Sequence, residues 1–211
     1  MCVRHVVSLS DSHAHLVTIA SKWSAGGQEP LPDPLVLVMP VWTPGSYLVR
    51  EFSRHVESPR ATLRGRKQRL LVRKIRKNAW AIYHGGASEV VFTYDLYCND
   101  LSVRTNHVDE THVYLNGAST FFFAEHAPQE GADLLLKLPS AFRVATVLEA
   151  SGPRHGPIYR AATYDELVDS PVHAGEHVER NFQVLGRPHQ FVVWGEARSA
   201  NWDDVTRDVR T

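Results

Sequence analysis

Two short clusters of histidine carry the donor atoms that a metal site needs. Residues His173-Ala-Gly-Glu-His177 match His-x-x-Glu-His, a zinc-binding pattern that works only when one helix face carries both imidazoles. Pro171 lies just before this segment, Gly175 lies inside it, and a strand is predicted from residue 178 onward. Proline and glycine both disfavour a helix here. We therefore expect no metal site at residues 173–177.

The second cluster consists of His107, Asp109 and His112. Side chains two residues apart point to the same side of a strand, so His107 and Asp109 would share a face in an extended segment. A polar surface loop explains the cluster equally well and is the interpretation we favour. His13 and His15 have the same spacing but no carboxylate or thiolate beside them, so we interpret them as sheet-surface or core histidines. We expect no metal ligand in this chain.

Catalytic groups are not evident either. The zinc-protease pattern His-Glu-x-x-His does not occur in the sequence. The serines of Gly45-Ser46 and Gly117-Ala-Ser119 lack the closing glycine of a nucleophile elbow. Cys2 and Cys98 have no neighbours that would make a redox pair, and two unpaired thiols are typical of a reducing compartment. We expect a cytoplasmic protein whose chain is not itself an enzyme.

A short acidic element is the best candidate for a binding site. Thr163 is a suitable helix cap, with Glu166 three residues later and Pro171 as a stop, so one or two helical turns are predicted. These turns concentrate negative charge on a surface that we expect to be exposed. The candidate site residues are Asp165, Glu166, Asp169 and Ser170.

A turn between two apolar runs is the second notable feature. Proline presets the backbone of the first central turn position and glycine accepts the positive φ of the second, so Pro44-Gly45 predicts a type II turn. The flanking strands are expected at residues 35–39 and 47–49. Trp42 and Tyr47 flank the turn, and we expect their burial to lock two sheets together.

The chain contains many short strand patterns. Segments rich in β-branched and aromatic residues recur at short intervals, most of them bounded by Gly, Pro, Asn or Asp. Residues 90–97 show the clearest alternation of apolar and polar side chains. A second helix is predicted at residues 202–209, with Asn201 as its cap. The predicted fold class is all-β, an antiparallel β-sandwich or saddle-like stack of sheets with one or two short helical turns.

The composition excludes several functions. With 211 residues, 43% hydrophobic and 22% charged, the chain resembles an ordinary soluble domain, and it has no apolar run of the ~18 residues that a membrane span needs. The net charge is zero, but residues 60–77 contain nine basic residues and no acidic one. Such a block can bind phosphates. Because leucine, valine and isoleucine interrupt it, we favour a solvated hairpin over a nucleic-acid site.

The turn segment also resembles a known motif. Residues 42–50, Trp-Thr-Pro-Gly-Ser-Tyr-Leu-Val-Arg, are similar to the W-x-P-G-S-Y-x-x-R signature of glycyl aminopeptidase-like zinc metallopeptidases. The resemblance recurs in family order at Trp80, at residues 94–104 and at residues 164–172. It implies the non-catalytic N-terminal β domain of such an enzyme. In that family a thermolysin-like catalytic domain, which holds the zinc, follows, and commonly a PDZ domain.

The resemblance also implies domain limits and partners. Residues 1–200 would form the β domain, and residues 201–211 would begin the linker or helix that leads into the catalytic domain. The parent enzyme would remove small N-terminal residues such as glycine or alanine with a zinc-activated water. This domain would pack on the catalytic domain of the same polypeptide and shape the cleft for the peptide substrate. The acidic element would border that cleft or the domain interface, because carboxylates bind a protonated amine.

Two other functions stay open from the sequence alone. The first is a free-standing β-sandwich that binds a peptide or a protein. The second, which we consider less favoured, is a nucleic-acid-binding domain that uses residues 60–77. If the chain is a domain separated from its partner, it should expose an apolar patch where the partner sits, and it should self-associate through that patch.

Overall fold

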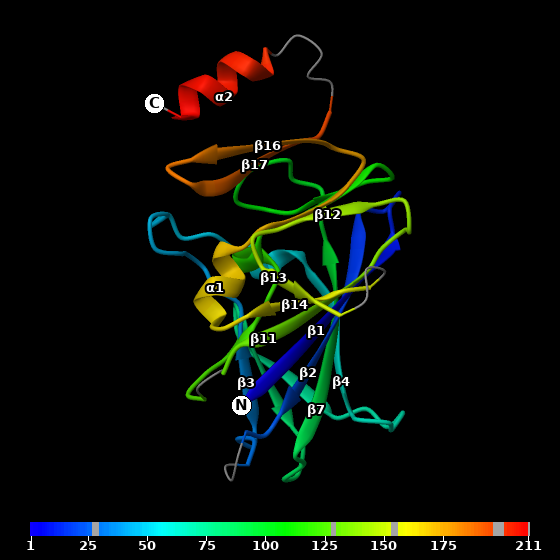
Figure 1. Cartoon of the computed structure of the whole chain (residues 1–211). Helices are drawn as coiled ribbons and strands as arrows, with labels where there is room; N and C mark the ends of the chain where they lie inside the picture. Colours follow the sequence, from blue (N-terminus) through cyan, green and yellow to red (C-terminus); the bar gives the residue numbers. More distant parts are fainter. Residues whose placement is uncertain (27–29, 128–129, 153–155, 196–200, 211) are drawn as a thin grey trace.

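A seven-stranded sheet forms the largest layer of the fold in the computed structural model, which describes residues 1–26, 30–127, 130–152, 156–195 and 201–210 (Figure 1). The strand order is β13-β14-β11-β1-β2-β7-β4. β1 and β11 are parallel, and the other neighbours in this sheet are antiparallel. The strands are β1 Cys2–Asp11, β2 Leu16–Ser24, β4 Val56–Leu63, β7 Glu89–Tyr97, β11 Ala132–Lys137, β13 Glu149–Ser151 and β14 Ile158–Ala161.

Alternation of side chains makes one face of this sheet the core. Every second residue of β2 is buried, and every second residue of β7 is buried opposite it. Trp23 pairs across the sheet with Val90, and Ile19 pairs with Tyr94. All four side chains are fully buried. The alternation predicted for residues 90–97 is confirmed.

A second, four-stranded sheet covers this apolar face. Its order is β10-β3-β6-β5, and all of its pairs are antiparallel. Its strands are β3 Leu35–Val38, β5 Leu71–Arg76, β6 Ala79–Tyr83 and β10 Phe123–Ala124. Trp80 of β6 meets Phe122 edge-on at 5.2 Å between ring centroids, and Phe122 meets Phe92 of β7 at 5.4 Å. These contacts join the two layers, and the predicted all-β sandwich is confirmed.

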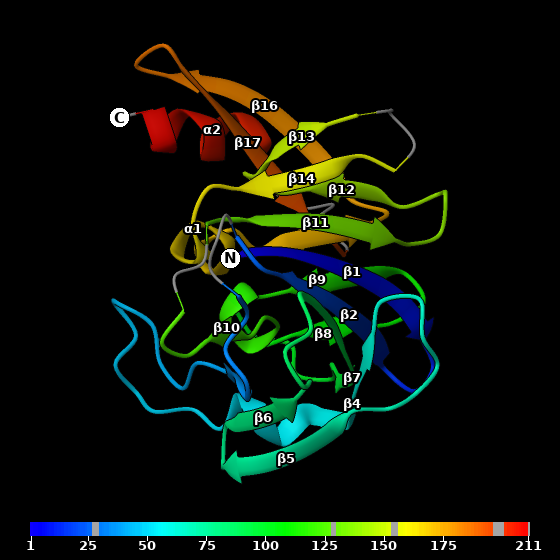
Figure 2. The same cartoon turned by 90° about the horizontal axis from the view of Figure 1, so that it is seen from below.

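The remaining strands form a third sheet and a hairpin, β16–β17, which lies at one end of the molecule (Figures 1 and 2). The third sheet has the order β12-β15-β9-β8, and β16 pairs with β17. The strands are β8 His107–Val108, β9 His112–Leu115, β12 Arg143–Ala145, β15 Val172–Gly175, β16 Val178–Val184 and β17 Arg187–Val193. The helical elements are the 3-10 turns η1 Phe52–His55 and η2 Gly117–Ser119, and the helices α1 Tyr164–Asp169 and α2 Trp202–Arg210.

Helix α2 begins where the sequence predicts it. The Asn201 side-chain oxygen accepts hydrogen bonds from the backbone N–H groups of Asp203, at 3.2 Å, and Asp204, at 3.4 Å. The predicted limit between residues 200 and 201 falls beside residues 196–200, which lie outside the described part of the chain. Neither α1 nor α2 has the length and apolarity needed to cross a bilayer.

One strand prediction is wrong, and several strands, β4 among them, were not predicted. Residues 47–49 are not a strand, because the chain leaves the turn as an exposed loop. β4 escaped notice because Pro59 interrupts its pattern. It lies at the sheet edge with a pairing irregularity between Glu57 and Arg60, and an edge bulge is where a strand tolerates proline.

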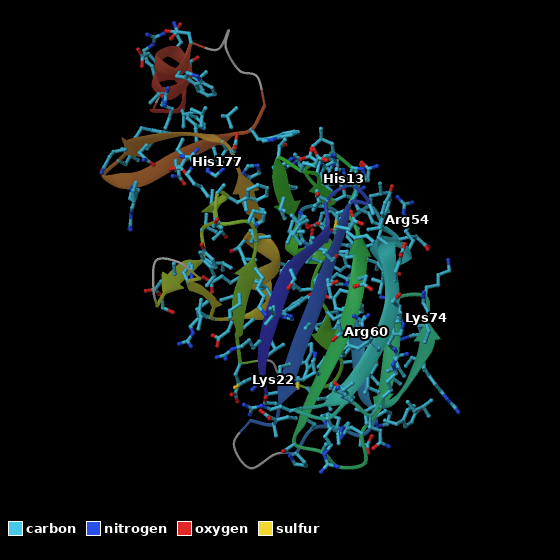
Figure 3. All side chains as sticks on the ribbon, turned by 90° about the vertical axis from the view of Figure 1, so that its right-hand side faces the viewer. His13, Lys22, Arg54, Arg60, Lys74 and His177 are labelled. Carbon is cyan, nitrogen blue, oxygen red and sulfur yellow. The ribbon has the colours of Figure 1, made fainter. Side chains whose placement is uncertain are left out.

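The basic block forms edge strands of two sheets. It runs from β4 to β5, and Figure 3 shows Arg60 and Lys74 on the same side of the molecule. Four of its cations are in ion pairs: Arg60 with Asp95, Arg64 with Glu89, Arg76 with Glu125, and Lys77 with Glu51. Lys74 also lies 4.7 Å from the centroid of the Trp80 ring. Charged side chains on edge strands discourage pairing with other chains, which accounts for the block without a nucleic acid.

A histidine lies in the core between the layers. His5 of β1 is fully buried between the rings of Trp23 and Phe121, at 6.1 and 4.7 Å between centroids. Its Nδ1 is hydrogen-bonded with the Ser21 hydroxyl at 2.8 Å. Burial lowers the pKa of His5 from 6.5 to about 3, so its imidazole is neutral at neutral pH.

We expect His5 to make the fold sensitive to acid. Because the folded-state pKa is below the unfolded value, the unfolded state binds the proton more readily, and stability falls as the pH decreases from 6.5 toward 3. The His5 contribution to that slope is at most about 1.4 kcal/mol per pH unit. Urea unfolding of the His5→Gln variant between pH 6.5 and 4.5 should show a shallower loss of stability. The matched variant of the exposed His126, His126→Gln, should keep the wild-type slope.

Candidate functional site

The proline–glycine turn has the geometry that its residues favour. The Ser46 N–H donates to the Thr43 carbonyl at 2.9 Å, and Gly45 has φ +82°, as the third residue of a type II turn requires. The Arg50 N–H donates to the Val41 carbonyl at 2.6 Å and closes the loop at its base. Residues 41–50 therefore form a closed loop with a defined tip.

The aromatics of this loop are exposed, contrary to expectation. Trp42 is 49% exposed and Tyr47 is 77% exposed. Their rings pack against each other, with centroids 5.9 Å apart, and do not join two sheets. Leu48 and Val49, which follow, are 67% and 65% exposed. The loop therefore presents a continuous apolar surface to solvent, and the expectation that its aromatics are buried is wrong.

Helix α1 has the predicted capping interactions. The Glu166 N–H donates to the Thr163 hydroxyl at 3.0 Å, and the Glu166 carboxylate accepts from the Ala162 N–H at 2.5 Å. Leu167 fixes the helix to the core, since its side chain is fully buried. The Tyr164 hydroxyl donates to the Phe121 carbonyl at 2.9 Å. Helix α1 is therefore held at a fixed position on the sandwich.

The four candidate residues on and beside α1 are not equivalent. Asp165 and Asp169 are exposed, and Glu166, although exposed, is engaged by the backbone of Ala162. Ser170 is only 3% exposed, so it is not on the acidic surface. Asp165 is the carboxylate that faces a hollow.

That hollow brings the two distant motifs together. It has a volume of about 510 Å³, and its wall includes Trp42 and Pro44 from the loop, Phe123 from β10, and Tyr164 and Asp165 from α1. The loop passes beside α1 in both views of the ribbon (Figures 1 and 2). An apolar hollow with one carboxylate at its edge suits a small amine-bearing ligand. We call it the loop–helix hollow.

Trp42 also contributes to the wall of a smaller hollow of about 40 Å³. Arg50 of the loop, Arg104 and Asn116 contribute to its wall. Residues 42–50, 94–104 and 164–172, which carry the sequence resemblance, thus converge around Trp42. The sequence order of these segments gives no sign of this convergence, because long-range pairing creates it.

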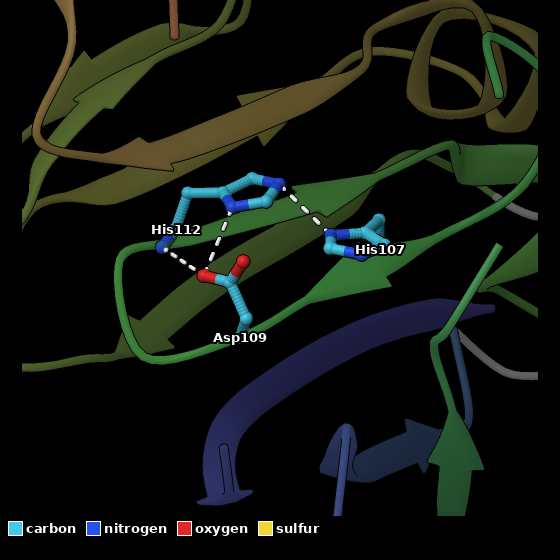
Figure 4. Close-up of side chains that lie close together, drawn as sticks. All are labelled: His107, Asp109 and His112. Carbon is cyan, nitrogen blue, oxygen red and sulfur yellow. Dashed lines mark hydrogen bonds and ion pairs between the residues drawn. The ribbon is translucent and has the colours of Figure 1, made fainter. Parts of the chain in front are cut away.

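The surface-loop interpretation of the cluster at residues 107–112 is wrong for its two histidines, and only Asp109 lies in the loop between the strands. His107 lies on β8 and His112 on β9, and Figure 4 shows both rings and Asp109 close together. His107 Nδ1 lies 3.2 Å from His112 Nε2, and His112 Nδ1 lies 3.1 Å from Asp109 Oδ1. One donor atom from each of the three residues lies within 4.8 Å of the others.

The charges of this cluster follow from its surroundings. Burial alone raises the pKa of Asp109, but hydrogen bonds from the Thr111 hydroxyl and from the N–H groups of Thr111 and His112 lower it to about 2. Burial lowers the pKa of His112, and Asp109 offsets only part of that effect. Burial also lowers the pKa of His173 to about 4, with His177 and His112 adding to the shift. His112 and His173 are therefore neutral at neutral pH.

The segment from His173 to His177 is not helical, as its proline and glycine indicate. His173 lies on β15, and the chain bends before His177, which lies next to the β16–β17 hairpin (Figure 3). The His177 ring meets the His173 ring edge-on at 5.0 Å, and His177 Nε2 pairs with Glu179 Oε1 at 2.8 Å. Of the other histidine pair, His13 is exposed and pairs with Glu110 at 2.5 Å.

Comparison with other proteins places this architecture in a family. The sequence profile of the Peptidase M61 N-terminal domain matches residues 4–176. This chain belongs to that family. The match stops before the β16–β17 hairpin, so the sandwich, the loop and α1 all lie within the M61 N-terminal domain, whereas the hairpin and α2 follow it. Comparison with curated proteins gives no match.

Solved structures similar to this M61 N-terminal domain are larger proteins. An aminopeptidase N family protein from Idiomarina loihiensis is 29% identical, with a TM-score of 0.87 over 99% of this chain and 35% of its own. An M1 zinc metallopeptidase from Deinococcus radiodurans is 8% identical, with a TM-score of 0.52 over 100% of this chain and 51% of its own. Aminopeptidase A from Legionella pneumophila is 12% identical, with a TM-score of 0.51 over 91% and 23%. The last two show a shared fold alone.

We expect the Thr163 cap to hold α1 in place. Thr163→Ala removes the acceptor for the Glu166 N–H and should lower the free energy of unfolding by about 1 kcal/mol. Asp165→Asn, on the same helix, keeps the cap and should have a smaller effect. Chemical denaturation of the two variants measures the difference. Equal effects would show that the cap does not stabilise α1.

Proposed function

We propose that this chain is the non-catalytic N-terminal domain of a zinc aminopeptidase, where it packs on the catalytic domain and forms one wall of the substrate cleft. The observation that carries the proposal is the convergence of residues 42–50, 94–104 and 164–172 around the exposed Trp42. If the three segments met in the interior, packing of the core would explain why they lie together. An exposed one requires a partner or a ligand to account for it.

Zinc chemistry is proposed for the rest of the parent polypeptide. A catalytic zinc of the kind proposed needs two histidines one helical turn apart with a glutamate as base, and this sequence has no His-Glu-x-x-His. His173 and His177 do not substitute for it, because they lie on a strand and a bend. The chain covers 35% of the Idiomarina protein. The rest of a polypeptide of that length is long enough to contain a catalytic domain.

We propose that the catalytic domain of the same polypeptide covers the exposed loop. Leu48 and Val49 do not belong to a strand, and they present large apolar side chains to solvent next to Trp42 and Tyr47. Apolar patches of this kind mark interaction surfaces. In the separated chain the same patch would favour self-association. The alternative of a free-standing peptide-binding module uses the same surface and predicts no dependence on a second domain.

The preference for small N-terminal residues and the cytoplasmic location are part of the same proposal. The loop–helix hollow is largely apolar and edged by Asp165, which suits a small apolar side chain beside a protonated amine. Cys2 and Cys98 are both free thiols, which fits a reducing compartment. Nucleic-acid binding is not favoured, because acidic neighbours already pair with four cations of the basic block.

Leu48→Asp tests whether the loop contacts the catalytic domain. In the 211-residue chain this exposed substitution should change the free energy of unfolding by less than about 0.5 kcal/mol. In the full-length polypeptide it should lower the melting temperature, since it would bury a carboxylate in an interface. Leu185→Asp, at a position 99% exposed on the β16–β17 turn, is the control and should be neutral in both. Neutral behaviour of Leu48→Asp in the full-length protein would contradict docking through this loop.

Asp165→Asn tests whether the loop–helix hollow receives the substrate amine. In the full-length enzyme the loss of one charge-assisted hydrogen bond should reduce kcat/KM for a glycyl or alanyl peptide about tenfold or more, chiefly through KM. Asp169→Asn, on the same helix, removes an equal charge and should leave the kinetics unchanged. If both variants behave as wild type, Asp165 does not contact the substrate, although docking of the domain would be unaffected.

A further inference from the structure

One face of the third sheet carries a row of histidines. His107 of β8 and His173 of β15 both lie opposite Tyr114 of β9 in the strand register. His112 precedes Tyr114 by two residues, so its side chain is on the same face. The opposite face, with Val113, Leu115 and Val172 among others, is buried in the core. The register thus collects three imidazoles from three strands on one side of the sheet.

The three rings follow one another in a row, in which the donor atoms of His107 and His112 belong to one cluster with Asp109 and the His173 ring lies beside His112. The centroids of His107 and His112 are 4.9 Å apart, and those of His112 and His173 are 5.6 Å apart. His107 Nδ1 and His112 Nε2 are separated by 3.2 Å. Two nitrogens that bind one tetrahedral zinc at 2.0–2.1 Å lie about 3.3 Å apart, so this pair already has the spacing of two ligands.

A carboxylate fixes the orientation of the central ring. Asp109 Oδ1 accepts the N–H groups of Thr111, at 2.7 Å, and of His112, at 3.0 Å, together with the Thr111 hydroxyl at 2.7 Å. The same oxygen lies 3.1 Å from His112 Nδ1, which therefore donates its proton to it and leaves the lone pair on Nε2, toward His107. Carboxylate–histidine pairs of this kind orient metal ligands and make them more basic.

His173 supplies an independent sign that a group is accommodated here. Both of its ring nitrogens are buried, and neither has a hydrogen-bond partner within the described ranges of the chain. A buried polar nitrogen without a partner is unfavourable unless something satisfies it. A metal ion bound to one of these nitrogens would do so.

We propose that His107, His112 and His173 bind one zinc-class transition-metal ion, with Asp109 orienting His112. Three imidazole nitrogens are a ligand set for Zn²⁺, Co²⁺, Ni²⁺ or Cu²⁺ and not for Mg²⁺ or Ca²⁺, which prefer oxygen. This proposal departs from the expectation that the chain has no metal ligand. It concerns a different surface from the loop–helix hollow, and it does not depend on the proposed function.

The ion would have an open coordination position. The histidine face forms part of a hollow of about 940 Å³, which the β16–β17 hairpin borders with Gln190 and Val192, and Trp194 lies at its edge. The Trp194 ring covers His112 at 3.6 Å between centroids, and its indole N–H donates to the Thr111 hydroxyl at 3.1 Å. Three protein ligands with a fourth position facing a cavity resemble sites that bind water or a small ligand, whereas structural zinc sites are closed.

Titration of the 211-residue chain with Zn²⁺ alone tests the site. Calorimetry, or competition with a chromogenic chelator, should show one ion per chain. His112→Ala and His173→Ala should each weaken binding at least tenfold, and Asp109→Asn should weaken it about 10–100-fold with unchanged stoichiometry. Bound Co²⁺ should show the ligand-field bands of a four-coordinate site. Circular dichroism verifies folding, and His107→Ala on the two-residue strand β8 replaces His112→Ala if that variant does not fold.

The chain has twelve histidines, so adventitious binding is the competing outcome. His13→Ala and His126→Ala, at exposed positions, are matched controls and should leave the affinity within twofold. Absence of one-to-one binding would overturn the proposal. So would binding that survives both His112→Ala and His173→Ala, or binding that is lost in His13→Ala.

Discussion

The arrangement of the domain depends on the aromatic contacts that Phe122 makes with both sheets. Its ring meets Trp80 of one sheet at 5.2 Å and Phe92 and Tyr94 of the other at 5.4 and 4.9 Å. The Tyr94 hydroxyl, fully buried, donates to the Thr120 carbonyl at 2.6 Å. Each such aromatic removes about 150–250 Å² from water, so this seam dominates the attraction between the layers. It also anchors residues 117–124 at the centre of the fold.

From that anchor, hydrogen bonds extend to both candidate sites. The Asn106 side-chain oxygen accepts from the Asn116 N–H at 2.8 Å and from the Ser119 and Thr120 hydroxyls at 2.9 and 3.1 Å. Asn106 directly precedes β8, so this network fixes the strand that carries His107. On the other side, α1 packs so closely on Gly117 that a Cβ there would lie 2.5 Å from the Leu167 carbonyl oxygen. One segment therefore positions the histidine face and the loop–helix hollow together.

Local signals in the sequence predict what local interactions determine. The alternation in β7, the Thr163 cap and the Asn201 cap each depend on neighbours within a few residues, and each is present. β4 was missed because its edge bulge contains Pro59, and only pairing with β7 makes the segment a strand. The histidine row was missed for the same reason: nothing near His107 or His112 in the sequence indicates that β15 will place His173 beside them.

The exposure of Trp42 is also a consequence of long-range structure. A sequence pattern assigns an aromatic beside a turn to the core, because burial is what usually stabilises aromatics. Here the Arg50–Val41 hydrogen bond closes the loop, and the Trp42 ring packs on Tyr47 while about half of its surface stays exposed. The loop keeps this form without a partner, because the positive φ of Gly45 and the closing hydrogen bond define it locally. An apolar surface whose shape is defined locally in this way would lose little conformational entropy on docking, which favours the interdomain contact that we propose.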